Sequence, residues 1–183
     1  MLLCGTIGAL AAPMTTGRIT SQPIGHYEFC QQAPAECRAT GRNVAPDRMT
    51  TKAWATMVEI NDRVNTTIIP RTDMEMWGKE EIWSYPVKYG DCEDYVLLKR
   101  HELIGAGFKP SNLLITVVLQ PNGDGHAVLT VRTDQGDFIL DNLVSSVMDW
   151  RDTRYRYLKR QSVANAGKWV DIVDERRNVA SSF

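Results

Sequence analysis

The sequence predicts an α+β fold in which helices come first and an antiparallel sheet follows. Two observations carry this prediction. Residues 49–65 and 91–104 have the spacing and composition of helices. The segments after them are short, apolar, rich in β-branched residues and separated by turn clusters; they are 113–119, 127–132 and 138–141. The length of 183 residues and the hydrophobic content of 43% are typical of one globular domain.

The first predicted helix covers residues 49–65. Thr50 and Thr51 are candidate caps at its start, and one apolar face is expected to pack inward. That face contains Trp54, Met57, Val58 and Ile60.

Residues 66–90 mix prolines and glycines with aromatic residues, which is typical of an irregular surface loop. Trp83 and Tyr85 either line a substrate groove or anchor the loop by packing. We prefer packing, because that is the commoner role of aromatic residues in such loops.

The second predicted helix, residues 91–104, has an acidic first turn and a glycine stop signal at Gly105 and Gly107. Beyond the three strands, residues 147–158 indicate a short amphipathic piece. Residues 168–173 indicate a last strand.

Charge excludes two classes of partner. The formal net charge is −1, from 21 basic and 22 acidic residues. Nothing in this balance favours nucleic acid or an anionic membrane surface, so we expect no nucleic-acid partner.

The N-terminal part of the chain differs in composition from the rest. Residues 1–12 are small and apolar and resemble the rear half of a signal peptide, although no basic residue precedes them. The alternative is a frayed apolar terminus; we take the segment as a truncated export signal and expect a soluble periplasmic protein. Residues 13–48 predict an extended arm, 49–175 the folded domain and 176–183 a tail.

If the chain is exported, the four cysteines can be assigned different roles. Cys4 leaves with the signal, and Cys30 and Cys37 are close enough in sequence to form a disulfide within the arm. The alternative is two reduced cysteines in a flexible segment. A zinc site there is disfavoured, because only His26 lies nearby. Cys92 is left without a partner.

Cys92 follows Asp91, the candidate cap of the second helix, where free backbone N–H groups and the helix dipole favour a thiolate. Unpaired cysteines are more often small buried hydrophobes, so Cys92 alone predicts little. His126 strengthens the prediction of a nucleophilic site, because it lies between a glycine-rich turn and a strand, where a side chain can face a cleft.

Asp141 ends the partner strand of the hairpin, within one to three residues of the position facing His126. A carboxylate there can orient the imidazole. His101 is nine residues after Cys92, on the opposite face of the helix, and His26 lies in the arm. We therefore predict a catalytic triad of Cys92, His126 and Asp141.

Three sequence elements carry a family resemblance: YGDCEDY at 89–95, GHAVL at 125–129 and LDN at 140–142. They resemble the bacterial transglutaminase-like cysteine peptidases, which include a periplasmic protease that releases biofilm adhesins. The resemblance covers roughly residues 50–175. It implies a papain-like or transglutaminase-like core, the Cys/His/Asp triad, an upstream cysteine pair and the WGKEEIW element at 77–83.

The acidic residues around Cys92 predict a cation site. Negative charge beside a thiolate raises its pKa, and a bound calcium ion would neutralise it. The resemblance implies calcium dependence through Asp91 and Glu93, with Asp94 as a weaker candidate. The alternative is simple helix capping by these carboxylates.

The leading functional hypothesis is an exported cysteine endopeptidase acting on a surface or secreted polypeptide. One alternative passes the acyl group to an amine, as a transglutaminase or amidase does. Another is a non-catalytic exported binding module. The resemblance also suggests a membrane-bound regulatory protein as a partner.

Overall fold

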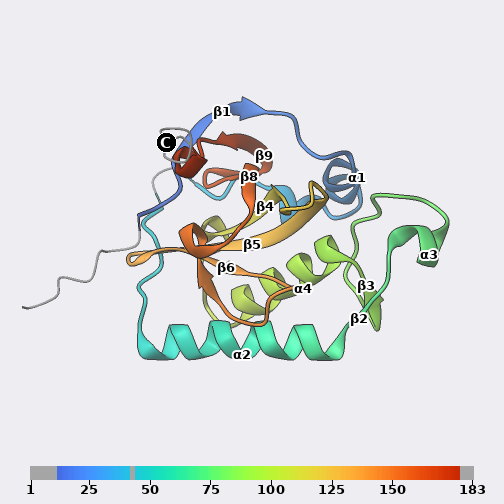
Figure 1. Ribbon diagram of the computed structural model, residues 1–183, viewed down its shortest axis with the longest axis horizontal. Helices are drawn as coiled ribbons and strands as arrows, with labels where there is room; N and C mark the ends of the chain where they lie inside the picture. The colour runs from blue at the N-terminus through green and yellow to red at the C-terminus, as the bar shows by residue number, and fades with distance from the viewer. Residues whose placement is uncertain (1–11, 42–43, 178–183) are drawn as a thin grey trace, which may run out of the picture.

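The computed structural model describes residues 12–41 and 44–177. Its centre is a seven-stranded sheet with the strand order β1-β9-β8-β4-β5-β6-β7, in which all neighbouring strands are antiparallel. Figure 1 shows helix α4 lying between the sheet and helix α2. The α+β prediction is confirmed.

Helix α2 spans Thr51–Thr67, close to the predicted 49–65. Thr50 is its N-cap, and the Thr50 hydroxyl oxygen accepts a hydrogen bond from the Ala53 N–H at 3.1 Å. The buried face contains Met57, Ile60 and Val64. Trp54 and Val58 are 38% and 39% exposed, so they lie at the margin of this face and not on it.

Helix α4, Cys92–Gly105, is the central helix of the fold. Its apolar side chains share one core with α2 and the facing side of the sheet. The helix stops where Gly107 adopts a φ of 99°, a left-handed conformation that favours glycine. The predicted stop signal is therefore the observed one.

The three predicted strands are present as β4 (Leu113–Leu119), β5 (Gly125–Thr133) and β6 (Gly136–Leu140). β5 and β6 pair in a hairpin that brings Leu129 opposite Leu140. The remaining long strands are β8 (Arg156–Ser162) and β9 (Asn165–Ile172), so the predicted last strand begins earlier than 168.

The amphipathic piece expected at 147–158 is not one element. Residues 148–149 form the short strand β7, Trp150–Asp152 form a 3-10 helix, and β8 begins at Arg156. Trp150 and Tyr157 pack edge to face, with ring centroids 5.5 Å apart, in a second, smaller core. The two aromatic residues therefore pack against each other across a bend in the chain, and the prediction of one amphipathic piece was wrong.

The N-terminal segment differs from the extended arm expected at 13–48. It contains strand β1 (Thr16–Thr20), helix α1 (Ile24–Gln32) and a 3-10 helix at Pro34–Cys37. β1 pairs with β9 at the edge of the sheet. These elements are short, and tertiary contacts such as the pairing of β1 with β9 and of His26 with Trp169 stabilise them, which is why local periodicity did not reveal them.

Residues 66–90 are largely irregular, as predicted, but contain the short helix α3 (Asp73–Trp77) and the parallel strands β2 (Ile69–Pro70) and β3 (Tyr89–Gly90). Within the described ranges, no helix is long and apolar enough to cross a membrane. The predicted export signal lies almost wholly outside the described residues, as does most of the predicted tail.

Candidate active site

Cys92 is the first residue of α4 and follows Asp91, the N-cap residue. The chain reaches it through Gly90, where an added Cβ would lie 2.8 Å from the Cβ of Asp94. Glycine is therefore required for the chain to pass so close to the helix start. In the described part of the chain, Cys92 is the only free cysteine, and it is partly buried.

His126 and Asp141 form a buried pair. His126 lies at the start of β5, Asp141 directly follows β6, and the His126 Nε2 is 2.8 Å from the Asp141 Oδ1. The side chains are each 3% exposed. The predicted proximity of these two residues is thus observed.

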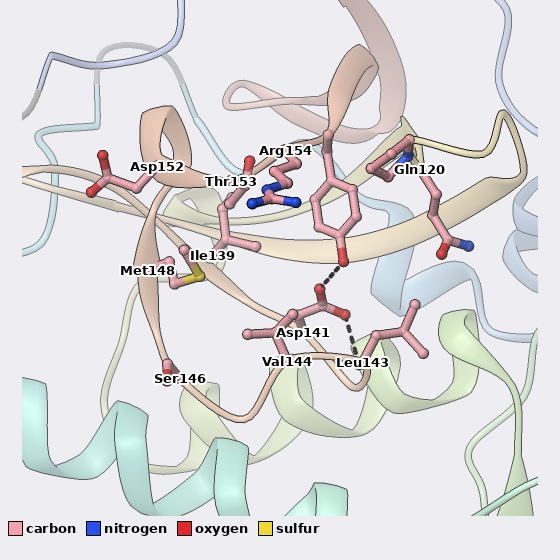
Figure 2. A pocket seen from close by; sticks show the side chains of 12 residues that line it. Gln120, Ile139, Asp141, Leu143, Val144, Ser146, Met148, Asp152, Thr153 and Arg154 are labelled. Atoms are coloured by element: carbon pink, nitrogen blue, oxygen red, sulfur yellow. Dashed lines mark hydrogen bonds between the residues drawn. The ribbon is translucent and has the colours of Figure 1, made fainter.

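Two further donors hold the Asp141 carboxylate in place (Figure 2). The Leu143 N–H donates to its Oδ1 at 2.9 Å, and the Tyr155 hydroxyl donates to its Oδ2. Burial raises the pKa of Asp141, but the hydrogen bond and charge of His126 and the Tyr155 hydrogen bond outweigh it, so the pKa lies below its usual value. Asp141 is therefore an ionised partner for His126.

Cys92 lies beside the start of β5. The sulfur interacts with the backbone N–H of Ala127, the residue after His126. Because Nε2 of His126 is bound to Asp141, Nδ1 is the nitrogen left to exchange a proton with a thiol. β5 and β6 thus bring His126 and Asp141 together, and the Ala127 contact places the Cys92 sulfur next to the residue that follows His126.

The Glu93 carboxylate contacts the Cys92 thiol. The Cys92 Sγ donates to the Glu93 Oε2 at 2.9 Å. Burial, followed by the charge of Glu93 and this hydrogen bond, raises the pKa of Cys92. The arrangement favours a protonated thiol unless positive charge enters the site.

Three carboxylates converge next to the nucleophile: Asp73, Asp91 and Asp94, with one oxygen of each within 4.8 Å of the others. Each has a buried oxygen that no other group of the described residues hydrogen-bonds. Burial is the main reason that the pKa of Asp91 rises to about 8 and that of Asp94 to about 7. Three orphaned carboxylate oxygens in one place suit a hard cation such as Ca²⁺.

The cluster differs from the predicted set of Asp91, Glu93 and Asp94. Asp91 and Asp94 are three residues apart, so they share one side of the helix start, whereas Glu93 contacts both the Cys92 thiol and the Asp91 carboxyl group. Asp73 was missed, because it comes from α3, 18 positions before Asp91. Its capping box, formed by Thr72 and Glu75, signals a helix start but not a cation site.

The irregular loop is anchored on the same acids. Asp73 accepts a hydrogen bond from the Ile82 N–H, and Asp94 Oδ1 accepts one from the Ser84 N–H at 2.8 Å. Trp83, between them, is 5% exposed and belongs to the main core. Trp83 therefore packs in the core. The side chain of Tyr85 is 37% exposed and lies nearer the surface.

The remaining candidate residues lie elsewhere. His26 is 1% exposed and packs against Trp83 and Trp169, and burial lowers its pKa to about 4. Cys30 and Cys37 lie beside it at disulfide distance, with Cα atoms 5.6 Å apart. His26, Cys30 and Cys37 also have ligand atoms within 4.8 Å of one another, a spacing that a metal ion could use. His101 packs edge to face against Tyr85.

A family model described as bacterial transglutaminase-like cysteine proteinase, BTLCP, matches residues 16–177. The chain belongs to this family. This proteinase is thus a cysteine peptidase, and its substrate is a protein. The match begins at β1, which agrees with an N-terminal segment that is part of the folded domain.

Solved structures of Legionella pneumophila LapG share the fold of this proteinase. The calcium-bound form is 22% identical with a TM-score of 0.55, over 68% of this chain and 71% of LapG. The EGTA-treated form is 19% identical with a TM-score of 0.55, over 86% of each chain. A comparison with curated proteins found no significant match.

Proposed function

We propose that this cysteine peptidase is an exported endopeptidase that uses Cys92, His126 and Asp141 as its triad and requires calcium. The observation that carries the proposal is the Asp141–His126 hydrogen bond through Nε2, which leaves Nδ1 for the thiol beside Ala127.

The chemistry follows from this geometry. His126 takes the proton of Cys92, and the thiolate sulfur attacks the carbonyl carbon of a peptide bond. His126 then gives the proton to the leaving amine, and a water molecule hydrolyses the thioester. The backbone N–H of Cys92, at the start of α4, can stabilise the oxyanion. Asp141 keeps the imidazole in one tautomer and stabilises its charged form.

Asp73, Asp91 and Asp94 would hold the calcium ion. A cation there supplies positive charge that offsets the carboxylates near Cys92 and so favours the thiolate. Support comes from the three unpartnered oxygens and from the LapG structure described as calcium-bound.

Export to the periplasm is part of the same proposal. The apolar segment 1–12 and the cysteine pair Cys30 and Cys37 favour an oxidising compartment. The family resemblance suggests a surface or secreted polypeptide as substrate and a membrane-bound regulatory protein as partner.

The experiment compares the wild-type protein with the variants Cys92→Ala, His126→Ala and His101→Ala. Each is incubated with secreted and surface proteins of the source cell in calcium, and new N-termini are mapped by mass spectrometry. New termini should appear with wild type and His101→Ala only. Cleavage by Cys92→Ala would overturn the triad, and ligation to amines without cleavage would favour an acyl transferase instead.

A further inference from the structure

We infer that the polypeptide segment bound beside the triad is acidic and carries a bulky apolar side chain. This inference rests on the proposed function and names the substrate class for the same site. It comes from two adjoining cavities that differ in chemistry, one apolar and one lined by arginines.

The apolar cavity has a volume of about 400 Å³ and lies against Asp141 (Figure 2). Its walls are the loop after β6, the start of the β4–β5 connection and residues 152–155. The apolar side chains are Ile139, Leu143, Val144 and Met148. Leu143 is 56% exposed, so an apolar occupant would cover surface that water now contacts.

The second cavity, of about 650 Å³, adjoins the first, because both are lined by Gln120, Pro121, Thr153, Arg154 and Tyr155. It contains no carboxylate, and four arginines line it: Arg151, Arg154, Arg156 and Arg176. The lining of this cavity is therefore positively charged, whereas the whole chain has a formal net charge of −1.

Two of these arginines already have partners, and two do not. Arg151 pairs with Asp149 at 3.1 Å, and Arg176 pairs with Asp174 at 2.6 Å. Arg154 and Arg156 are exposed and make no ion pair or side-chain hydrogen bond to any described residue. Their free guanidinium groups suit carboxylates, which they can bind with two parallel hydrogen bonds.

Tyr155 connects the cavities to the triad. It lines both, its hydroxyl donates to Asp141, and its ring centroid lies 5.6 Å from that of His126. A peptide lying over Tyr155 would therefore pass within one side chain of the imidazole. In the apolar cavity, the carboxylates are Asp141, which is bound to His126, and Asp152, which points away from Asp141 in Figure 2.

An extended acidic polypeptide fits these features better than a polyanion such as nucleic acid. The positive groups are confined to one concave site, whereas a nucleic acid needs a basic stripe and the chain has a net charge of −1.

The first experiment profiles wild-type cleavage with a proteome-derived peptide library in calcium. The best peptide is then remade with its Asp and Glu residues replaced by Asn and Gln, or its apolar side chain by Ser. We expect KM for the acidic parent to be about tenfold lower than for either replacement, since one charged hydrogen bond contributes about one tenfold step in affinity. Equal KM values would overturn the inference.

Matched double variants locate the effect. Arg154→Glu with Arg156→Glu should raise KM for the acidic peptide about tenfold or more, leave kcat nearly unchanged and abolish the salt dependence of KM. The control, Arg18→Glu with Lys52→Glu, makes the same charge change at exposed sites in β1 and α2. An equal rise in the control would show a general charge effect and overturn the inference. Leu143→Ser should weaken only peptides with the apolar side chain.

Binding separates this inference from the proposed function. The acidic and neutral peptides, labelled with a fluorophore, are titrated into Cys92→Ala protein and followed by polarisation. Preferential binding of the acidic peptide, lost in the arginine double variant, sustains the inference even if wild type cleaves no peptide. Cleavage without acidic preference, or no preferential binding, overturns the inference and leaves the endopeptidase proposal standing or falling on its own test.

Discussion

Asp141 controls which nitrogen of His126 carries the proton. The carboxylate has no hydrogen to give, so Nε2 must donate and Nδ1 is free to accept from Cys92. Tyr155 and the Leu143 N–H occupy further positions on the carboxylate, which prevents its rotation.

The variant Asp141→Asn tests this role. An amide can donate to Nε2, which moves the proton to Nδ1 and stops the imidazole from taking the thiol proton. We expect kcat to fall by about a thousandfold or more, by analogy with the same change in serine triads, with little change in KM. Steady-state kinetics with a cleavable peptide measure this. A fall of less than tenfold would show that Asp141 is not the orienting group.

Lys99 is a second residue of interest on α4. It lies seven positions after Cys92, is 0% exposed, and its Nζ has no hydrogen-bond partner among the described residues. Burial lowers its pKa to about 7, although Asp141 opposes this shift. A buried ammonium without a partner opposes folding.

The variant Lys99→Met should be more stable than wild type. The pKa is about 7 when folded and near 10.5 when unfolded, so the cost is present in full below about pH 7 and fades as pH rises to 10.5. Denaturant unfolding should show a gain of about 3 to 5 kcal/mol at pH 6 to 7 that shrinks toward pH 10. Lys52→Met, at an exposed position, is the control. Parallel pH profiles for Lys99→Met and wild type would contradict the prediction.

At the scale of elements, helix α1 supports the loop that faces the acidic cluster. An added Cβ at Gly25 would lie 2.5 Å from the Glu81 carbonyl oxygen and 2.5 Å from the Trp83 ring. Ile82 and Ser84, in the same loop, donate to Asp73 and Asp94. The close contact at Gly25 thus links the N-terminal segment to the loop that hydrogen-bonds Asp73 and Asp94.

Gly25→Ala should therefore displace the loop and weaken calcium binding. We expect a loss of about 1 to 3 kcal/mol of stability from overpacking and a several-fold weaker calcium affinity by calorimetry. Gly105→Ala is the matched control, because an added Cβ there meets nothing within 4 Å. If both variants bind calcium equally well, α1 does not position the acidic loop.

At the scale of the whole molecule, the cation cluster links three parts of the fold: α3, the irregular loop and the start of α4. Repulsion among buried carboxylates opposes this arrangement without a cation, and binding to the folded state alone would stabilise it.

Calcium should raise the melting temperature. A concentration of 100 times Kd gives about 2.7 kcal/mol, which corresponds to about 5 to 10 °C for a domain of this size. Asp73→Asn should remove most of this shift, while Asp62→Asn, an exposed substitution on α2, should preserve it. Differential scanning calorimetry in calcium and in EGTA makes the comparison. The calcium proposal fails if wild type melts at one temperature in both.

Much of the fold and site was predictable because the signals are local. The cap at Thr50, the stop at Gly107, the β4 run and the 134–135 hairpin turn each depend on neighbouring residues. The hairpin then placed His126 near Asp141 by pairing alone. α1 and β1 were not predictable, because contacts far along the chain stabilise them, such as His26 with Trp169 and β1 with β9. The bend at 147–158 is made of a two-residue strand and a 3-10 helix, which are too short to give a periodic pattern.

The sequence by itself determined the order of the main elements, the family motif and the three residues proposed as the triad, since each lies within a short patterned segment. The tertiary structure decided which acids stand together. It set Asp73 beside Asp91 and Asp94, brought Glu93 into contact with Cys92 and Asp91, and set Tyr155 between His126 and the arginine-lined cavity. These groupings join residues from separate elements, so only packing in three dimensions brings them within hydrogen-bond range.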